Sequence, residues 1–276
     1  MSDGEVERRV LAGGAEGLEL LSWSGSEGAA RTPLLFVHGA YVGAWCWAEH
    51  FLGWFGAQGF PAFAVSLRGH GKSSGRERLH GFGLDDYAED LATAVAALPR
   101  PPVLVGHSMG AMVVQKYLER GSAPAAAFLC PVPPTGLLPA SFALAFTKPA
   151  LFAELNAMAT GGRPSPVALR DALFSGPLDE AALARHYARM QGESRRALMD
   201  MSGWGLPMRW RMDLPESLVV AAERDVLIPL AQVRLGAHHL GAEFRMLPGM
   251  GHAVMLEEGW ADAAGMLLDW LSGLGL

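Results

Sequence analysis

The sequence of 276 residues contains only two cysteines, Cys46 and Cys130. Two thiols are too few for a disulfide framework or for a zinc site built from cysteines. A chain of this length with 50% hydrophobic residues can bury a large core and does not need covalent cross-links. We therefore expect both cysteines to be buried free thiols.

Long apolar segments and an excess of positive charge are also missing. No run of about 18 uncharged apolar residues occurs, and Met1 to Val10 is polar, unlike a secretory signal. The chain has 22 Lys and Arg against 28 Asp and Glu, a formal net charge of −6. Nucleic acids and anionic membranes bind clustered basic residues. We expect a cytoplasmic protein whose partner is a small molecule, with no nucleic-acid or membrane partner.

Strand-like and helix-like segments alternate along most of the chain. Residues 33–38 are so uniformly apolar that the strand should be buried on both faces, as in a central parallel sheet. Alternation of this kind predicts an α/β fold with a mostly parallel central sheet and helices on both faces. The predicted strands are 17–24, 33–38, 61–67, 102–106, 125–130, 217–222 and 242–247. The predicted helices are 44–58, 84–98, one ending near Arg120, 229–240 and 257–271.

The alternation stops between residues 131 and 213. This stretch is rich in Pro, Met and Phe, and its helical patches at roughly 140–160, 167–175 and 178–191 are not accompanied by a clear strand. We predict a core domain made of residues 1–130 and 214–276, interrupted by a helical cap at 131–213.

Residues 66–75, SLRGHGKSSG, contain two partial motifs. A phosphate-binding P-loop would need glycine at position 66, where Ser66 stands, and a helix that starts at the Lys72-Ser73 pair. The string Gly71 to Gly75 also matches G-x-S-x-G, but it lies in a polar loop and lacks a preceding strand and a following helix. Neither motif predicts a site here.

A second G-x-S-x-G string, Gly106 to Gly110, follows a buried strand directly and leads into a helical pattern. This is the context of a nucleophile elbow, in which glycines two residues on either side of the serine let strand and helix approach closely. The pattern predicts Ser108 as a nucleophile. A purely structural glycine-rich helix entry is the alternative.

A serine nucleophile needs a base and a group that orients the base. Asp225 follows the strand at 217–222, and His252 lies in a loop after the last predicted strand. The carboxyl ends of parallel strands meet at one edge of the sheet, so Ser108, Asp225 and His252 should converge there. Asp225 and His252 could instead be an ordinary turn carboxylate and loop histidine. Glu223 and Asp213 are reserve candidates for the carboxylate, and His238 and His239 are expected at the surface of a helix.

These motifs resemble the α/β-hydrolase superfamily over almost the whole chain. His38-Gly39-Ala40 resembles the family's oxyanion loop, residues 67–73 its R-G-H-G-x-S loop, and residues 106–110 its elbow. The resemblance implies an oxyanion hole made by the backbone N–H groups of Ala40 and Met109. It also implies a structural role for His38, His107 and the 66–75 loop. No metal or organic cofactor is implied. The stretch HGAYVGAWCW is also similar to plant-type esterases and hydroxynitrile lyases.

Large apolar residues of the insertion could form an adaptable substrate pocket. Such a pocket favours uncharged apolar groups over strongly anionic substrates, for which no basic cluster is visible. The predicted pocket residues are Tyr41, Phe142, Phe146, Met158, Met201 and Trp204. A wider set of candidates comprises Phe152, Phe174, Met190, Met199, Met208, Trp210 and Met212.

The expected activity is hydrolysis of carboxylic esters with small to medium apolar groups, through an acyl-enzyme on Ser108. A lactonase or perhydrolase, a hydroxynitrile lyase, a C–C hydrolase and a small-molecule receptor without turnover remain alternatives, because a fold alone does not decide among them.

Overall fold

The computed structural model describes residues 4–12, 17–24, 31–159, 162–176 and 178–276. Their strands form one sheet in the order β1-β2-β4-β3-β5-β6-β7-β8. The β1–β2 and β2–β4 pairs are antiparallel and the remaining pairs are parallel, which confirms the predicted mostly parallel sheet. The strands are β1 (Val6–Leu11), β2 (Leu18–Trp23), β3 (Leu34–Val37), β4 (Ala62–Val65), β5 (Val103–His107), β6 (Ala126–Leu129), β7 (Ser217–Ala222) and β8 (Glu243–Leu247).

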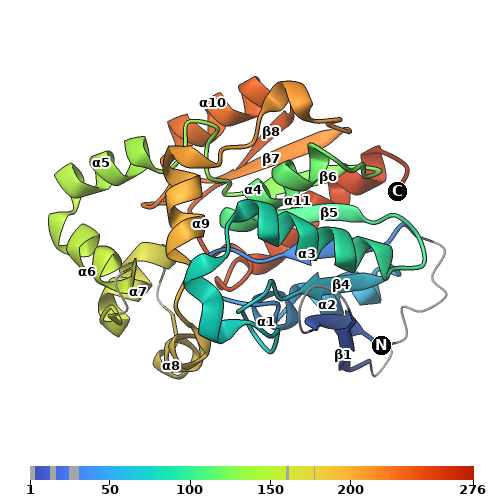
Figure 1. The fold of residues 1–276 in the computed structure, drawn as a ribbon, viewed down its shortest axis with the longest axis horizontal. Coiled ribbons are helices and arrows are strands. Elements are labelled where there is room, and N and C mark those ends of the chain that lie inside the picture. Colours follow the sequence, from blue (N-terminus) through green and yellow to red (C-terminus); the bar gives the residue numbers. More distant parts are fainter. Residues whose placement is uncertain (1–3, 13–16, 25–30, 160–161, 177) are drawn as a thin grey trace.

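Helices cover both faces of this sheet (Figure 1). Side chains of a strand alternate between faces, so Leu34 and Phe36 of β3 join one hydrophobic cluster while Leu35 and Val37 join the other. The first cluster includes α1 (Trp45–Ala48), α2 (Phe51–Ala57) and α11 (Trp260–Gly273). The second includes α3 (Leu84–Ala96), α4 (Met109–Leu118) and α10 (Leu230–Leu240). The uniform apolarity of the central strands follows from this burial on both sides.

The chain between β6 and β7 contains helices and loops, with no strand among its described residues. In Figure 1, α5, α6 and α7 extend to the left of the sheet. These elements stand where sequence patterns predict a helical insertion. They are α5 (Leu138–Thr147), α6 (Pro149–Ala159), α7 (Pro166–Leu173), α8 (Glu180–Arg189), α9 (Arg195–Met199), a π-helical turn (Asp200–Trp204) and a short 3₁₀ turn (Arg209–Arg211).

The structure corrects three features of the sequence interpretation. The polar N-terminal stretch forms β1, an edge strand whose first five side chains are exposed, so its residues carry no apolar alternation. The helix predicted at 44–58 is divided into α1 and α2. The helix predicted at 140–160 is divided at Lys148, because a residue before proline is disfavoured in helical geometry. Residues 1–3 of the N-terminal stretch and residue 160 lie outside the described residues.

Cys46 and Cys130 are both buried and free, as predicted. Burial raises the pKa of both thiols. Within the described ranges, none of the helices has the length and apolar character needed to cross a bilayer.

Candidate active site

Ser108 occupies a sharp turn between β5 and α4. Its φ of 52° lies in the left-handed region, which costs a non-glycine residue energy. A Cβ atom at Gly106 would lie 2.5 Å from the carbonyl oxygen of Gly110, and one at Gly110 would lie 2.4 Å from that of Val37. Both positions therefore require glycine, and the serine is held at the carboxyl end of the central strand by its tightly packed neighbours.

His252 and Asp225 meet at the same edge of the sheet. The Nδ1 atom of His252 lies 2.7 Å from Oδ2 of Asp225, and both side chains are buried. Oδ1 of Asp225 accepts hydrogen bonds from the amides of Leu227 and Ile228, which fix the carboxylate. With its Nδ1–H donating to Asp225, the neutral imidazole keeps Nε2 available as a proton acceptor.

The reserve carboxylates are placed elsewhere. Glu223 is exposed and accepts a hydrogen bond from the amide of Gly249. Asp213 is exposed and its amide donates to the carbonyl of Leu118. The structure thus pairs the histidine with Asp225. His238 and His239 are exposed on α10, as expected.

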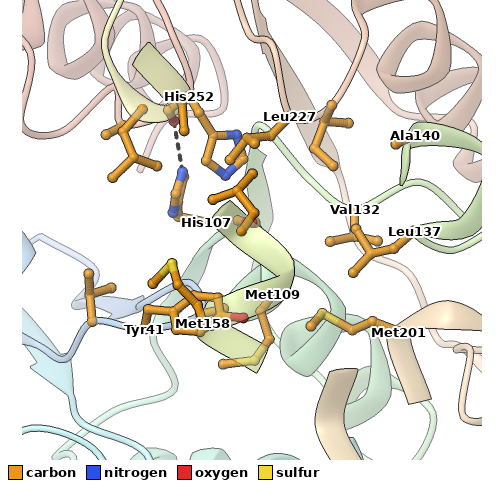
Figure 2. Close-up of a pocket in the computed structure, with 18 of the residues that line it drawn as sticks. Tyr41, His107, Met109, Val132, Leu137, Ala140, Met158, Met201, Leu227 and His252 are labelled. Carbon is orange, nitrogen blue, oxygen red and sulfur yellow. Dashed lines mark hydrogen bonds between the residues drawn. The ribbon is translucent and has the colours of Figure 1, made fainter. Parts of the chain in front are cut away.

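Ser108 and His252 line one cavity. Within the described chain the Ser108 hydroxyl forms no hydrogen bond with another side chain, so it is free to react with a bound substrate. The loop that carries His252 is fixed by His107, whose Nε2–H donates to the carbonyl of His252 over 2.9 Å (Figure 2). Burial lowers the pKa of His107 well below its ordinary value, so the imidazole stays neutral in this supporting position.

Ala40 and Met109 also border this cavity. Among the described residues neither amide has a hydrogen-bond acceptor. Two unpaired donors beside a serine hydroxyl are the arrangement that stabilises an oxyanion. The residue after Ala40 is Tyr41, whose φ of 67° is strained for a bulky side chain.

A buried carboxylate from the insertion holds Tyr41 in place. Glu193, 1% exposed, accepts hydrogen bonds from the Tyr41 amide (3.2 Å) and the Tyr87 hydroxyl (3.0 Å), and pairs with His70 (3.0 Å). The Tyr41 carbonyl accepts from the amide of Gln191 over 2.9 Å. Burial alone would raise the pKa of Glu193, but His70 and the hydrogen bonds outweigh it and lower the pKa. Sequence patterns gave no signal for this contact, because its partners come from distant segments.

A second buried carboxylate holds the histidine loop. Glu257 accepts hydrogen bonds from the amides of Gly251 (2.8 Å) and Ser175 (2.7 Å). The hydroxyl of Ser175 donates to the carbonyl of Gly249. The loop before and after His252 is therefore fastened to the segment that follows α7.

The cavity has a volume of about 300 Å³ and a mainly apolar lining. It lies between the carboxyl ends of the strands and the helical insertion. Tyr41, Met158 and Met201 line it, as the sequence analysis expects, and so do Phe152 and Met190. Other side chains of the lining include Val132, Leu137, Ala140, Ser141, Leu144, Leu155, Leu169, Leu198 and Leu227, which sequence patterns did not single out.

The prediction that Phe142, Phe146 and Trp204 line the pocket is wrong. Their exposed fractions are 63%, 87% and 76%, and none of them borders the cavity. On α5, Ala140 and Leu144 share the face toward the cavity, so residues two positions later point to the opposite side. Of the wider set, Met199, Met208 and Trp210 are exposed, while Phe174 and Met212 pack in the core.

One group of potential metal ligands occurs in the described part of the chain. Ligand atoms of His107, Cys130 and His252 lie within 4.8 Å of one another. His107 and His252 are already committed through Nε2 and Nδ1 to hydrogen bonds. A cysteine binds a metal as its thiolate. Burial raises the pKa of Cys130 well above its ordinary value, which keeps the thiol protonated. These three side chains are therefore better suited to hydrogen bonding, with the thiol protonated, than to binding a metal ion.

Comparisons with known proteins identify the family of this chain. A family model described as the alpha/beta hydrolase family matches residues 34–264. A monoacylglycerol lipase of Mycolicibacterium smegmatis is 30% identical over 220 residues, which cover 74% of this chain and 75% of that protein. Together these matches indicate a carboxylic ester hydrolase.

Solved structures share the fold at lower identity. A thermophilic esterase has a TM-score of 0.70 and 19% identity, covering 98% of this chain and 99% of its own. An enzyme that degrades N-acyl homoserine lactones has a TM-score of 0.69 and 20% identity, covering 95% and 99%. With a family match over most of its length and a serine elbow on its central strand, the chain belongs to the α/β-hydrolase family.

Proposed function

We propose that the protein hydrolyses carboxylic esters with Ser108 as nucleophile, His252 as general base and Asp225 as the residue that orients the imidazole. The observation that carries this proposal is the 2.7 Å hydrogen bond between Asp225 and His252 at the cavity that Ser108 also lines. A serine hydroxyl is a weak nucleophile, and an oriented neutral imidazole supplies the base that it needs.

In the first half of the reaction, Ser108 Oγ bonds to the ester carbonyl carbon while its proton moves to Nε2 of His252. The amides of Ala40 and Met109 stabilise the resulting oxyanion. When the intermediate collapses, the bond to the alcohol oxygen breaks and the alcohol leaves with the proton from His252. Water then attacks the acyl-enzyme, gives its proton to His252, and the acid leaves as Ser108 regains its proton.

The cavity supports an ester with an apolar acyl chain. Its lining is mostly aliphatic and Met side chains, which bind hydrocarbon through burial rather than through specific polar contacts. The named activity of the lipase relative, on monoacylglycerols, is compatible with such a substrate. We further propose that residues 131–213 act as the cap of this site, because much of the lining comes from them.

A chain-length series of p-nitrophenyl esters tests the proposal. Ser108→Ala should lower kcat/KM by roughly 10⁴-fold or more, and Ser141→Ala, which removes another hydroxyl lining the cavity, should stay within a few-fold of wild type. A Ser108→Ala variant that folds and retains more than a tenth of the activity contradicts the assignment. Tight ligand binding with negligible turnover supports the receptor alternative, and cyanohydrin cleavage without ester hydrolysis supports the lyase.

A further inference from the structure

A second cavity of about 290 Å³ adjoins the first. Four residues line both cavities: Tyr41, Met158, Leu169 and Met190. Tyr41 and Met158 lie together at the lower side of the view in Figure 2. The two cavities are therefore neighbours, and the second cavity lies next to the proposed oxyanion loop.

The second cavity differs from the first in charge. Arg76 and Arg163 line it together with Tyr187, Gln191 and Gly192. Among the described residues of this lining none is acidic. The protein has a net charge of −6, whereas the charged side chains described in this cavity are two arginines. This local positive charge favours an anionic ligand.

Both guanidinium groups are held in place by neutral acceptors. Nη2 of Arg76 donates to Gln191 Oε1 over 2.5 Å and to the carbonyl of Gly71 over 3.2 Å. Arg163 donates to the carbonyl of Tyr187 over 3.0 Å, and its Cζ lies 4.4 Å from the centre of the Tyr187 ring.

These contacts leave N–H groups of both arginines available for a further acceptor. In the described part of the chain neither guanidinium pairs with a carboxylate. A guanidinium has five N–H donors arranged to match a carboxylate or phosphate. Each arginine therefore keeps donors for an external anion.

We propose that this second cavity binds an anionic group, a carboxylate or a phosphate, on the alcohol half of the ester while the acyl half occupies the apolar cavity. The inference rests on the proposed function and refines its substrate class. It also revises the expectation that the pocket favours uncharged groups over strongly anionic substrates. That expectation missed this pair because residues 76 and 163 are far apart in sequence and no basic cluster is visible there.

Two phenyl esters of nearly equal shape test this inference: para-(hexanoyloxy)benzoate, an anion, and para-(hexanoyloxy)benzamide, which is neutral. Wild-type protein should hydrolyse the anion with about tenfold or greater advantage in kcat/KM, mainly through KM. The advantage should shrink as the ionic strength rises from about 0.01 to about 1 M, because salt screens exposed charges.

The double variant Arg76→Gln, Arg163→Gln should lose the preference for the anion and hydrolyse both esters with similar kcat/KM. Arg170→Gln is the matched control, since Arg170 is an exposed arginine paired with Asp171 and does not line the cavity. It should keep the preference for the anion. A wild-type protein without this preference, or a double variant that retains it, overturns the inference.

A binding measurement separates this inference from the proposed function. Calorimetry with para-hydroxybenzoate and para-hydroxybenzamide should show tighter binding of the anion to wild type and to Ser108→Ala, with the difference lost in the double variant. If neither ester is hydrolysed but this binding pattern is found, the proposed function fails and the anion site stands. If Ser108-dependent hydrolysis is found with equal affinity for both compounds, only the anion site fails.

Discussion

Glu193 accepts a hydrogen bond from the backbone amide of Tyr41, 152 residues earlier in the chain. The contact joins the helical insertion to the residue that follows Ala40. Because Tyr41 has a strained, left-handed backbone, an external partner is needed to keep this conformation populated. The orientation of the backbone N–H group of Ala40 therefore depends on a side chain of the insertion.

Glu193→Gln should lower kcat more than it changes KM, by about tenfold, and should reduce the free energy of unfolding by about 3 kcal/mol. The variant leaves His70 without its buried carboxylate partner. Steady-state kinetics and urea unfolding measure the two effects. Glu180→Gln, at an exposed position of α8 in the same insertion, should change neither by a comparable amount. An unaltered kcat in Glu193→Gln would speak against the role of Glu193.

Asp225→Asn should reduce kcat by about 10⁴-fold with little loss of stability, because an amide favours the wrong imidazole tautomer. Glu223→Gln is the control. Its side chain can still accept the hydrogen bond from Gly249, and it does not contact His252. Rates on one p-nitrophenyl ester compare the two variants. Equal losses in both would indicate that His252 is oriented by a different group.

Gly110→Ala should destabilise the protein by about 3 kcal/mol, because the new Cβ would collide with the backbone carbonyls of Val37 and His38. Gly265→Ala, in α11, should stabilise it by about 1 kcal/mol, since a Cβ there meets no atom within 4 Å. Thermal and urea unfolding of both variants check the opposite signs. A Gly110→Ala protein of wild-type stability would refute the close packing of the elbow.

The free energy of unfolding should decrease at acidic pH, because the buried histidines stay neutral in the native protein. Burial lowers the pKa of His38 from 6.5 to about 3, and that of His107 well below 6.5. His38 is satisfied as a neutral ring, which donates to the Gly39 carbonyl and accepts from the Leu67 amide. Below pH 6.5 these two histidines take up protons in the unfolded chain but not in the native protein, so their contribution lowers the stability by up to about 2.7 kcal/mol per pH unit.

Urea unfolding at several pH values between about 7 and about 5 measures this slope. In His107→Gln, whose amide can still donate to the carbonyl of His252, the slope should decrease by up to about 1.4 kcal/mol per pH unit. A free energy of unfolding that is constant over this range would contradict the neutral, buried state of both rings.

Phe146→Ser should leave the kinetics of a hexanoyl ester unchanged, because Phe146 points away from the cavity. Leu144→Ala, two residues earlier in α5, should lower kcat/KM about tenfold. Leu144 lines the cavity, and its truncation would leave part of the bound acyl chain in contact with water. An equal effect of the two variants would mean that α5 rotates or moves when substrate binds.

Much of the architecture could be predicted from local patterns. The run of apolar residues before Gly106 and the helical periodicity after Gly110 made Ser108 a candidate, because an elbow is a local strand–turn–helix unit. Asp225 and His252 could be predicted to approach it because parallel strands end at one edge of a sheet. The charged strand β1 escaped detection because it is stabilised by backbone pairing with β2 and buries almost none of its side chains.

The sequence by itself determined the α/β alternation, the glycines that the turn at Ser108 requires, and the chain order of the serine, carboxylate and histidine. Only the tertiary structure decided which face of α5 meets the cavity, that Glu193 reaches Tyr41, and that Arg76 and Arg163 share one hollow. The physical reason is the distance along the chain over which each interaction acts. Hydrophobic periodicity and turn chemistry act over a few neighbouring residues, whereas these contacts arise from how the helical insertion packs onto the ends of the strands.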